Sequence, residues 1–245
     1  MSKVIVITGA GIGLGRALAR RFVADGEQVV LLGRTLSKLE KLADELGDSA
    51  MAVACDVSSP DQVRAAFAAI AERHPKIDVL INNAAVYEPF PIAEATDDQI
   101  LKAIAINVAG PILCARSAIP MLGRGGHIIN LSSDSVETNF PLLTLYQTTK
   151  AGVERFSLSL QRELEPAGIR VTFVRAGQMM DAEKTWDIDP AAKLRFAKAA
   201  MEAGINLMQR PITQFASVTQ VFRSLIDLPP DLHATGITLQ ARTAS

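Results

Sequence analysis

The chain has 245 residues, with 25 lysines and arginines against 26 aspartates and glutamates, which gives a formal net charge of -1. This length fits one large α/β domain, and the balanced charge excludes the electrostatic footprint of a nucleic-acid or anionic-lipid binder. The two cysteines, Cys55 and Cys114, have neither CxxC spacing nor a histidine nearby in sequence, and the three histidines are scattered. The sequence therefore argues against a metal site and against a disulfide framework.

The first residues, MSKVIVITGAGIG, lack the basic region, long apolar stretch and small-residue cleavage site of a secretory signal. No segment has the roughly 18 uninterrupted apolar residues that a membrane span needs. We therefore expect a soluble cytoplasmic protein.

Seven short apolar segments, rich in valine and isoleucine, recur along the chain. Segments that are apolar at consecutive positions are typical of strands covered on both faces of a sheet. They are VIVITG (4–9), QVVLLG (28–33), AMAVACDV (50–57), IDVLINNAA (77–85), HIINLSS (127–133), IRVTFVRAG (169–177) and GITLQA (236–241).

Helical patterns separate these predicted strands. Apolar residues repeat every four positions within 14–22 and within 156–164, and residues 97–122 have the length of one long helix interrupted near Gly110-Pro111. This alternation predicts an α/β fold, a doubly wound and mostly parallel seven-stranded sheet with helices on both faces. No linker, repeat or low-complexity tract divides the chain, so we expect a single domain over residues 1–245.

One long segment departs from the alternation of strands and helices. Residues from about 178 to 212 follow a predicted strand and contain two apparent helical pieces and the only tryptophan, Trp186. In an open α/β sheet, ligands bind beyond the carboxyl ends of the strands. We therefore expect this insertion to be a lid or a wall of the substrate site.

The segment TGAGIGLGRAL follows the first predicted strand and begins the first predicted helix. Its glycines allow a tight turn, a close approach of the backbone to a ligand and packing of the helix on the sheet: Gly9, Gly11, Gly13 and Gly15. The N–H groups at the helix start can then bind a pyrophosphate. A glycine-rich turn alone is a weak signal, but strand, loop and helix occur here in the order that a Rossmann-type dinucleotide site requires.

The second predicted strand ends in Gly33 and Arg34 rather than in a carboxylate. A carboxylate here hydrogen-bonds the adenosine ribose of NAD, whereas an arginine pairs with the 2′-phosphate of NADP. The sequence therefore favours NADP(H) over NAD(H), although Arg34 could also be a solvated residue at a helix start. Asp56, after the third strand, could accept a hydrogen bond from the adenine amino group or cap the turn before the next helix.

Tyr146 and Lys150 lie four positions apart in a segment with helical periodicity. At this spacing the two side chains share one helix face, so the lysine ammonium can stabilise the phenolate. A tyrosine in water titrates near ~10 and needs such a neighbour to be a useful acid or base at neutral pH. Taken alone, the pair is more typical of an exposed helix surface.

Five motifs occur in an order that is typical of one family. They are TGAGIGLG (8–15), NNAA (82–85), Asn107 in INVAG, the serine pair 132–133 and YQTTK (146–150). Together they resemble the short-chain dehydrogenases/reductases, of the single-domain type of about 250 residues. The resemblance covers essentially the whole chain and implies an NAD(P)-dependent oxidoreductase that acts on CH–OH and C=O groups.

The resemblance implies a catalytic group of Asn107, Ser133, Tyr146 and Lys150, because the family's serine usually stands thirteen residues before the tyrosine. In ketone reduction negative charge grows on the carbonyl oxygen, so Tyr146 would protonate this oxygen while Ser133 orients it. Lys150 would lower the pKa of the phenol and hold the cofactor ribose, and Asn107 would keep Lys150 in place through a water. Alone, Ser133 could simply end a strand and Asn107 could be a helix-kink residue.

The family pattern also implies a set of cofactor-binding residues, and the sequence departs from this pattern at two places in one segment. The implied residues are Gly9, Gly11, Ile12, Gly13, Gly15, Arg34, Asp56, Val57, Asn83, Tyr146, Lys150 and Gly177, while Asn82 would bridge strands. In RAGQMMD, Ala176-Gly177 and Asp181 stand where the family commonly has Pro-Gly and a threonine. This replacement alters the segment that normally holds the carboxamide of the nicotinamide.

Apolar side chains near the expected active site suggest the substrate. We expect a moderately sized apolar or aromatic ketone, or the matching secondary alcohol. The foremost lining candidates are Tyr87, Phe140, Met179 and Trp186, and further candidates are Phe90, Pro91, Leu142, Leu143, Met180, Met201 and Met208. Some of these side chains will instead be ordinary core or subunit contacts.

The sequence thus predicts an NADPH-dependent carbonyl reductase, reversible as an alcohol dehydrogenase. An NAD-dependent dehydrogenase of a hydroxylated metabolite is the alternative, and a dinucleotide-binding regulator without catalysis is a third interpretation. The expected partners are a small-molecule substrate and further copies of the chain, with no nucleic acid and no membrane. Family members usually form tetramers through helices that correspond to 97–123 and 145–166, so we expect a homotetramer, with a homodimer as the alternative.

Overall fold

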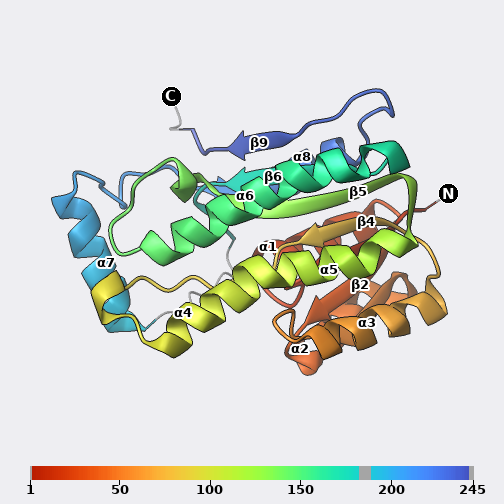
Figure 1. Ribbon diagram of the computed structural model, residues 1–245, viewed down its shortest axis with the longest axis horizontal. Coiled ribbons are helices and arrows are strands. Elements are labelled where there is room, and N and C mark those ends of the chain that lie inside the picture. The colour runs from red at the N-terminus through yellow and green to blue at the C-terminus, as the bar shows by residue number, and fades with distance from the viewer. Residues whose placement is uncertain (1, 182–188, 243–245) are drawn as a thin grey trace.

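The computed structural model describes residues 2–181 and 189–242, and a sheet of seven strands forms its centre (Figure 1). Every pair of neighbouring strands is parallel, in the order β3-β2-β1-β4-β5-β6-β9. The bounds are β1 (Val4–Thr8), β2 (Gln28–Gly33), β3 (Ala50–Ala54), β4 (Ile77–Asn82), β5 (Leu122–Ser133), β6 (Arg170–Ala176) and β9 (Gly236–Leu239). The predicted sheet is confirmed, and the order reverses between β1 and β4, where ligands bind in such folds.

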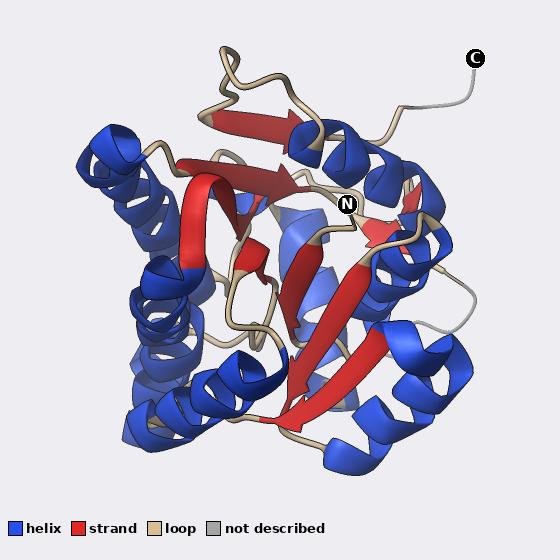
Figure 2. Cartoon of the chain, turned by 90° about the vertical axis from the view of Figure 1, so that its right-hand side faces the viewer, coloured by secondary structure: helices blue, strands red, loops and turns tan. Residues whose placement is uncertain are grey.

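Helices cover both faces of the sheet, which confirms the doubly wound prediction (Figure 2). On one face, Leu18, Phe22 and Phe222 pack against the strands from α1 (Gly13–Ala24) and α8 (Phe215–Ile226), beside α2 (Leu36–Leu46). On the other face, Phe67, Cys114 and Leu160 do so from α3 (Pro60–Arg73), α5 (Gly110–Ala118) and α6 (Thr144–Leu164). Burial of these two apolar faces is the main source of stability of the layered fold.

The long helix expected over residues 97–122 is divided by a π-helical turn. α4 (Asp97–Ile104) leads into this turn, Ala105–Ala109, and α5 follows it. The Gly110 N–H donates to the Ala105 carbonyl, whereas Pro111 has no N–H to donate to the carbonyl of Asn107. The interruption predicted near Gly110-Pro111 therefore lies just before these residues, and Asn107 is inside it.

By length and composition alone, the helical run Asp97–Met121 is apolar enough to cross a membrane. Within the fold, however, Cys114, Ala115 and Ala118 of this run are buried against the sheet and α3. Its apolar character is therefore explained in part by its place in the core.

The described part of the insertion lies at the end of the molecule toward which the strands point (Figure 1). The insertion begins with the two-residue strand β7 (Met179–Met180) and is followed by another, β8 (Thr213–Gln214), and these two pair in a small parallel sheet. The helix α7 (Pro190–Glu202) lies between them in the sequence. The Thr213 N–H also donates to the Gln178 carbonyl at 3.0 Å. The ends of the insertion are therefore joined at its base.

A ladder of buried amides fixes α6 on the sheet. The Asn82 side chain donates to Asn130 at 2.8 Å, and Asn130 donates to the Ser157 hydroxyl at 2.8 Å. Asn82 thus bridges β4 and β5 as predicted. Because Ser157 belongs to α6, the same ladder also sets the height of this helix over the strand ends.

His127 on β5 is buried and neutral. Its Nε2 lies 2.8 Å from the Thr172 hydroxyl, which itself donates to the Ala234 carbonyl, so Nε2 carries the proton. Among the described residues Nδ1 has no hydrogen-bond partner. Burial, then the charges of Arg170 and His233, lowers the pKa of His127 to about 3.

This depressed pKa predicts acid destabilisation. The neutral imidazole contributes stability above the unfolded pKa of about 6.5, and the contribution is lost as the pH falls toward the folded pKa. Between pH 6 and 4 the free energy of unfolding should fall by about 1.4 kcal/mol per pH unit from this residue. Urea titrations should show a clearly flatter pH dependence for His127→Gln, and a weaker flattening for His74→Gln, which removes a more exposed imidazole whose pKa burial also lowers. Equal slopes for the wild type and both variants would contradict the prediction.

Candidate active site

The glycine loop lies at the point where the strand order reverses. Gly9 and Gly13 adopt φ values of 66° and 55°, and a Cβ on Gly9 would lie 2.9 Å from the Ala84 Cα. Only glycine fits there without strain. No side chain caps α1, which begins at Gly13, so N–H groups of its first turn remain available for an anion.

Asn83 joins this loop to the end of β4. Its side chain donates to the carbonyls of Thr8 at 2.9 Å and Gly9 at 3.2 Å, and its backbone N–H donates to the Thr8 hydroxyl at 3.0 Å. The two strands that flank the reversal point are thereby held together. Asn83 therefore shapes the loop as well as facing the cavity beside it.

The loop lines a cavity of about 400 Å³, a volume within the usual range of small-molecule and cofactor sites. Eight of the residues predicted for the cofactor line it: Gly9, Gly11, Ile12, Gly13, Arg34, Asp56, Val57 and Asn83. Of the remaining four, Gly15 packs α1 on the loop, since a Cβ there would lie 2.4 Å from the Gly9 carbonyl oxygen. The other three do not line this cavity: Tyr146 and Lys150 are on α6, with the Lys150 ammonium on the Leu131 carbonyl of β5, and Gly177 directly follows β6.

Two further features of the cavity concern its charged residues. Lys38, in the first turn of α2 and four residues after Arg34, also lines it and was not predicted. Asp56 Oδ1 accepts from the Ser58 N–H at 2.9 Å and from the Ser58 hydroxyl at 2.6 Å. Asp56 therefore does cap the turn, which was one of its two predicted roles, and it faces the cavity too.

Ser133 and Tyr146 meet beyond the end of β5. The Ser133 Oγ accepts from the Ser135 N–H at 3.2 Å, and its hydroxyl lies within reach of both Asp134 Oδ1, at 3.5 Å, and the Tyr146 phenol, whose pKa it lowers. Gln147, next to Tyr146, donates to the carbonyls of Ser135 and Thr138, both at 2.7 Å. These bonds dock the start of α6 on the loop after β5 and so define the distance between serine and tyrosine.

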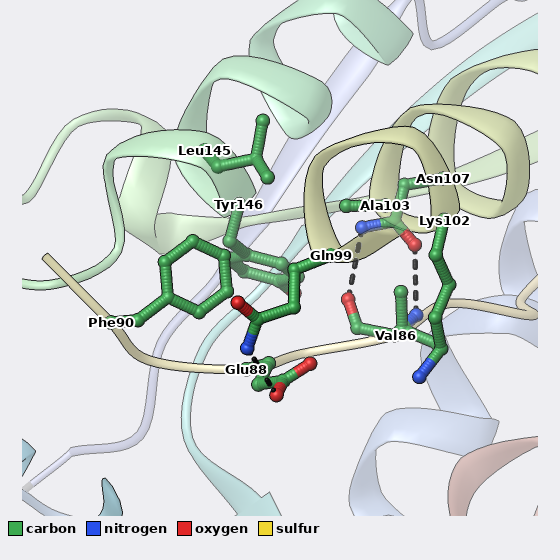
Figure 3. A pocket seen from close by; sticks show the side chains of 9 residues that line it. All are labelled: Val86, Glu88, Phe90, Gln99, Lys102, Ala103, Asn107, Leu145 and Tyr146. Carbon is green, nitrogen blue, oxygen red and sulfur yellow. Dashed lines mark hydrogen bonds between the residues drawn. The ribbon is translucent and has the colours of Figure 1, made fainter. Parts of the chain in front are cut away.

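Lys150 and Asn107 complete the predicted group. The Lys150 ammonium lies 5.8 Å from the centroid of the Tyr146 ring and donates to the Leu131 carbonyl at 2.8 Å. Asn107 donates to the Thr149 hydroxyl at 3.1 Å, and its amide forms two hydrogen bonds with the backbone of Val86, at 2.8 and 2.9 Å (Figure 3). The structure thus brings all four predicted side chains to one place.

Burial dominates the ionisation of this group. It raises the pKa of Tyr146 to about 12, against the hydrogen bond from Ser133 and with the added effect of the Asp134 charge. Burial also lowers the pKa of Lys150 to about 8. In this structure the phenol is therefore a protonated donor at neutral pH, and the lysine is still mostly cationic.

A small polar cavity of about 10 Å³, the size of one water, adjoins Asn107 and Tyr146 (Figure 3). Glu88, Gln99 and Lys102 line its far side, and Gln99 donates to Glu88 at 2.8 Å.

Aromatic rings cover Tyr146 on its other side. Tyr87 meets it edge to face with the ring centroids 5.0 Å apart, and Phe196 of α7 lies 6.3 Å from Tyr87 and 6.2 Å from Phe140. Tyr87 and Phe140 therefore lie where the sequence analysis predicted a wall of the substrate site. Phe196 belongs to the same group of rings but was not predicted. Leu142, in the same loop, has a left-handed φ of 61°, which is strained for leucine and shapes the entry to α6.

The other substrate candidates are placed differently. Met179 is buried in the core beside α8 rather than facing Tyr146, while Met201 and Met208 are 54% and 92% exposed. Met179 faces the core because β7 pairs with β8, and successive side chains of a strand point to opposite faces. Trp186 lies outside the described residues.

The doubly wound sheet, the glycine loop at its reversal point and the serine–tyrosine–lysine group beyond the strand ends define the class of Rossmann-fold oxidoreductases. The chain belongs to the short chain dehydrogenase family, whose sequence profile matches residues 3–191. It is accordingly an oxidoreductase of a family that acts on hydroxyl and carbonyl groups, and for which NAD(P) dependence is typical.

Individual relatives agree with this assignment. The chain is 37% identical over 191 residues to a serine 3-dehydrogenase of Agrobacterium fabrum, which covers 76% of this chain and 75% of that protein. It is 35% identical over 179 residues to an NADP-dependent 3-hydroxy acid dehydrogenase of Salmonella typhi, 71% of each. The closed form of a serine dehydrogenase complexed with NADP+ has a TM-score of 0.86 at 26% identity, covering 99% of this chain and 96% of that one.

Proposed function

We propose that the protein uses NADPH to reduce the carbonyl of a moderately sized apolar or aromatic ketone to a secondary alcohol, reversibly. The observation that carries the proposal is the Ser133 hydroxyl beside the Tyr146 phenol, next to the rings of Tyr87, Phe140 and Phe196, with Lys150 Nζ 5.8 Å from the Tyr146 ring centroid. An apolar substrate would replace water over the phenol, which strengthens hydrogen bonds to a developing oxyanion.

Each side chain has a defined task in this proposal. A bound NADPH would supply the hydride that reaches the carbonyl carbon. Tyr146, protonated at neutral pH because of its burial, donates its proton to the carbonyl oxygen, while the Ser133 hydroxyl fixes that oxygen. Lys150 supplies positive charge beside the phenol and would bind the cofactor ribose. Asn107 is hydrogen-bonded to the Val86 backbone and to the hydroxyl of Thr149, the residue before Lys150.

The preference for NADP(H) rests on two cations at one end of the 400 Å³ cavity. Arg34 and Lys38 both line it next to Gly33, and no carboxylate stands at the end of β2. A guanidinium and an ammonium together suit a 2′-phosphate. The dehydrogenase of Salmonella typhi is named NADP-dependent and the serine dehydrogenase structure holds NADP+.

Arg34→Asp should lower kcat/KM for NADPH by about 100-fold, because it removes a charged hydrogen bond and adds a repulsive charge. The value for NADH should change far less. Steady-state kinetics with both cofactors check this, and Arg20→Gln, which breaks an exposed pair with Glu45 on the outside of α1, is the matched control. An equal loss with both cofactors would remove Arg34 as the selector.

The direct test of the function is to follow NADPH and NADH absorbance with the purified protein and a panel of aliphatic, aromatic, steroidal and acyl-thioester ketones. Consumption of NADPH with an apolar or aromatic ketone supports the proposal. Turnover of NAD with hydroxylated metabolites instead supports the alternative; the names of two relatives, a serine 3-dehydrogenase and an NADP-dependent 3-hydroxy acid dehydrogenase, favour its hydroxylated substrate and not its cofactor. Cofactor binding without any turnover would point to a dinucleotide-binding regulator.

We also propose a single domain, with residues 178–212 as a lid, in a cytoplasmic homotetramer. The assembly is supported by large apolar side chains that stand exposed on the helices named for it. Leu101 and Ile104 on α4, Ile112 on α5 and Leu158 on α6 are 39% to 64% exposed. Such side chains are typical of a surface that a second copy covers, and sedimentation equilibrium would give the assembly size.

A further inference from the structure

A partly buried ion pair joins the insertion to the active site. Asp134 directly follows Ser133 and is only 7% exposed, and its Oδ2 accepts a hydrogen bond from Arg210 at 2.7 Å. Arg210 lies between α7 and β8, and its guanidinium is 4.8 Å from the Phe140 ring centroid. One cation of the insertion therefore contacts both the carboxylate beside Ser133 and the aromatic wall.

The position of Asp134 makes its charge important for Tyr146. Its Oδ1 lies 3.5 Å from the Ser133 Oγ, which hydrogen-bonds the Tyr146 phenol. A carboxylate there opposes the loss of a proton from the phenol, and the Asp134 charge indeed acts to raise the pKa of Tyr146. The Arg210 cation reduces this opposing field because the two opposite charges are in contact.

Other ionisable groups also face Tyr146 and belong to different elements. Lys150 lies on the same helix, 5.8 Å from the ring centroid, and Tyr87 comes from the loop after β4. Glu88 and Lys102 line the small polar cavity that Tyr146 also borders. Of the described charged groups named near Tyr146, only the Asp134–Arg210 pair includes a residue of the insertion. Arg210 comes from that segment, and Asp134 does not.

We propose that Arg210 is a positioning residue for proton transfer: seated against Asp134, it neutralises this carboxylate and thereby allows Tyr146 to release its proton in alcohol oxidation. The inference rests on the proposed role of Tyr146 as the acid and base. It assigns the insertion a second task beyond covering the substrate. Because Phe196 and Arg210 belong to the same segment, the aromatic wall and the charge compensation are put in place together.

The test is the pH profile of alcohol oxidation by the full chain with NADP+. Tyr146 must be ionised as the base, so the midpoint of the kcat/KM profile reports its proton affinity in the free enzyme. Arg210→Gln should move the midpoint about one pH unit to higher pH, and Asp134→Asn about one unit to lower pH. The double variant should lie between them, close to the wild type, and Arg210→Lys should shift the midpoint less than Arg210→Gln.

A matched control separates charge from anchoring. Arg195 of α7 also fastens the insertion, through two hydrogen bonds of 2.9 Å to Glu94, but this pair is exposed and is not in contact with Ser133 or Asp134. Arg195→Gln should leave the midpoint in place, whatever it does to KM. If Arg210→Gln changes only KM, or if the Asp134 and Arg210 variants shift the midpoint in the same direction, the pair binds substrate or anchors the segment, and the inference is wrong.

A second measurement needs no substrate and distinguishes the inference from the proposed function. The chain has two tyrosines, Tyr87 and Tyr146, so fluorotyrosine incorporated into the protein gives two fluorine NMR signals, which Tyr87→Phe assigns. The Tyr146 signal should titrate at higher pH in Arg210→Gln and at lower pH in Asp134→Asn. Turnover that survives Tyr146→Phe would overturn the proposed function, whereas an unmoved Tyr146 titration would overturn only the inference.

Discussion

Tyr146→Phe is expected to lower kcat for ketone reduction by about 10²–10⁴-fold, the usual contribution of a positioned general acid. The substitution removes only the phenol oxygen, so the edge-to-face contact with Tyr87 and the place of the ring beside it are retained. The loss should appear in kcat rather than in the KM for the cofactor, because the missing proton donor acts in the transition state. Single-turnover NADPH oxidation measures it directly.

Tyr87→Phe is the matched control for this prediction, since it removes the same atom from the other tyrosine of the same cluster. Its loss should be no more than about tenfold, as for a contact that orients without transferring a proton. Thermal unfolding of both variants should be similar. A comparable loss in the two variants would show that the cluster as a whole, rather than the Tyr146 hydroxyl, carries the effect.

Glu27→Leu should have the largest effect on stability, about 3 kcal/mol in the free energy of unfolding. Glu27 is 7% and Arg223 9% exposed, and the carboxylate accepts from the Arg223 guanidinium at 2.6 Å and from the Lys3 N–H. Removing the carboxylate leaves a buried cation that Asp227, half exposed, compensates only in part. Urea unfolding curves measure the change.

Two comparisons test the physical reason. Glu45→Leu breaks the exposed pair with Arg20 and should cost less than about 1 kcal/mol. The double variant Glu27→Leu/Arg223→Met should recover much of the loss, because an apolar pair can replace a buried ion pair at little net cost. If the double variant were as unstable as the sum of the single variants, the loss would come from packing and not from an uncompensated charge.

The sheet was predictable because its information is local. Consecutive apolar residues identify buried parallel strands, and all seven predicted segments contain a strand. What could not be predicted depends on distant pairing. β5 begins at Leu122 rather than at His127, since Leu122 pairs with Ile77 across a shift in register. β7 and β8 have two residues each and carry no periodicity of their own.

The candidate site was predictable to the extent that it lies in motifs. Loop, serine, tyrosine, lysine and asparagine occur at fixed spacings, and the structure brings them together. Phe196 and Arg210 were missed because they reach the site only through the folded insertion. Asp134 was missed although it is next to Ser133, since an acidic residue at a strand end is an ordinary turn former until its partner is known.

The joined base of the insertion bears on how new specificities can arise in this fold. Because β7 and β8 pair side by side, the chain leaves the main body and returns to it at neighbouring points. Lengthening such a closed excursion costs little chain entropy, about 0.6 kcal/mol for each doubling of its length. The stretch between Met180 and Thr213 can therefore vary in length and sequence around Phe196 and Arg210, while the sheet beneath it keeps the shared chemistry.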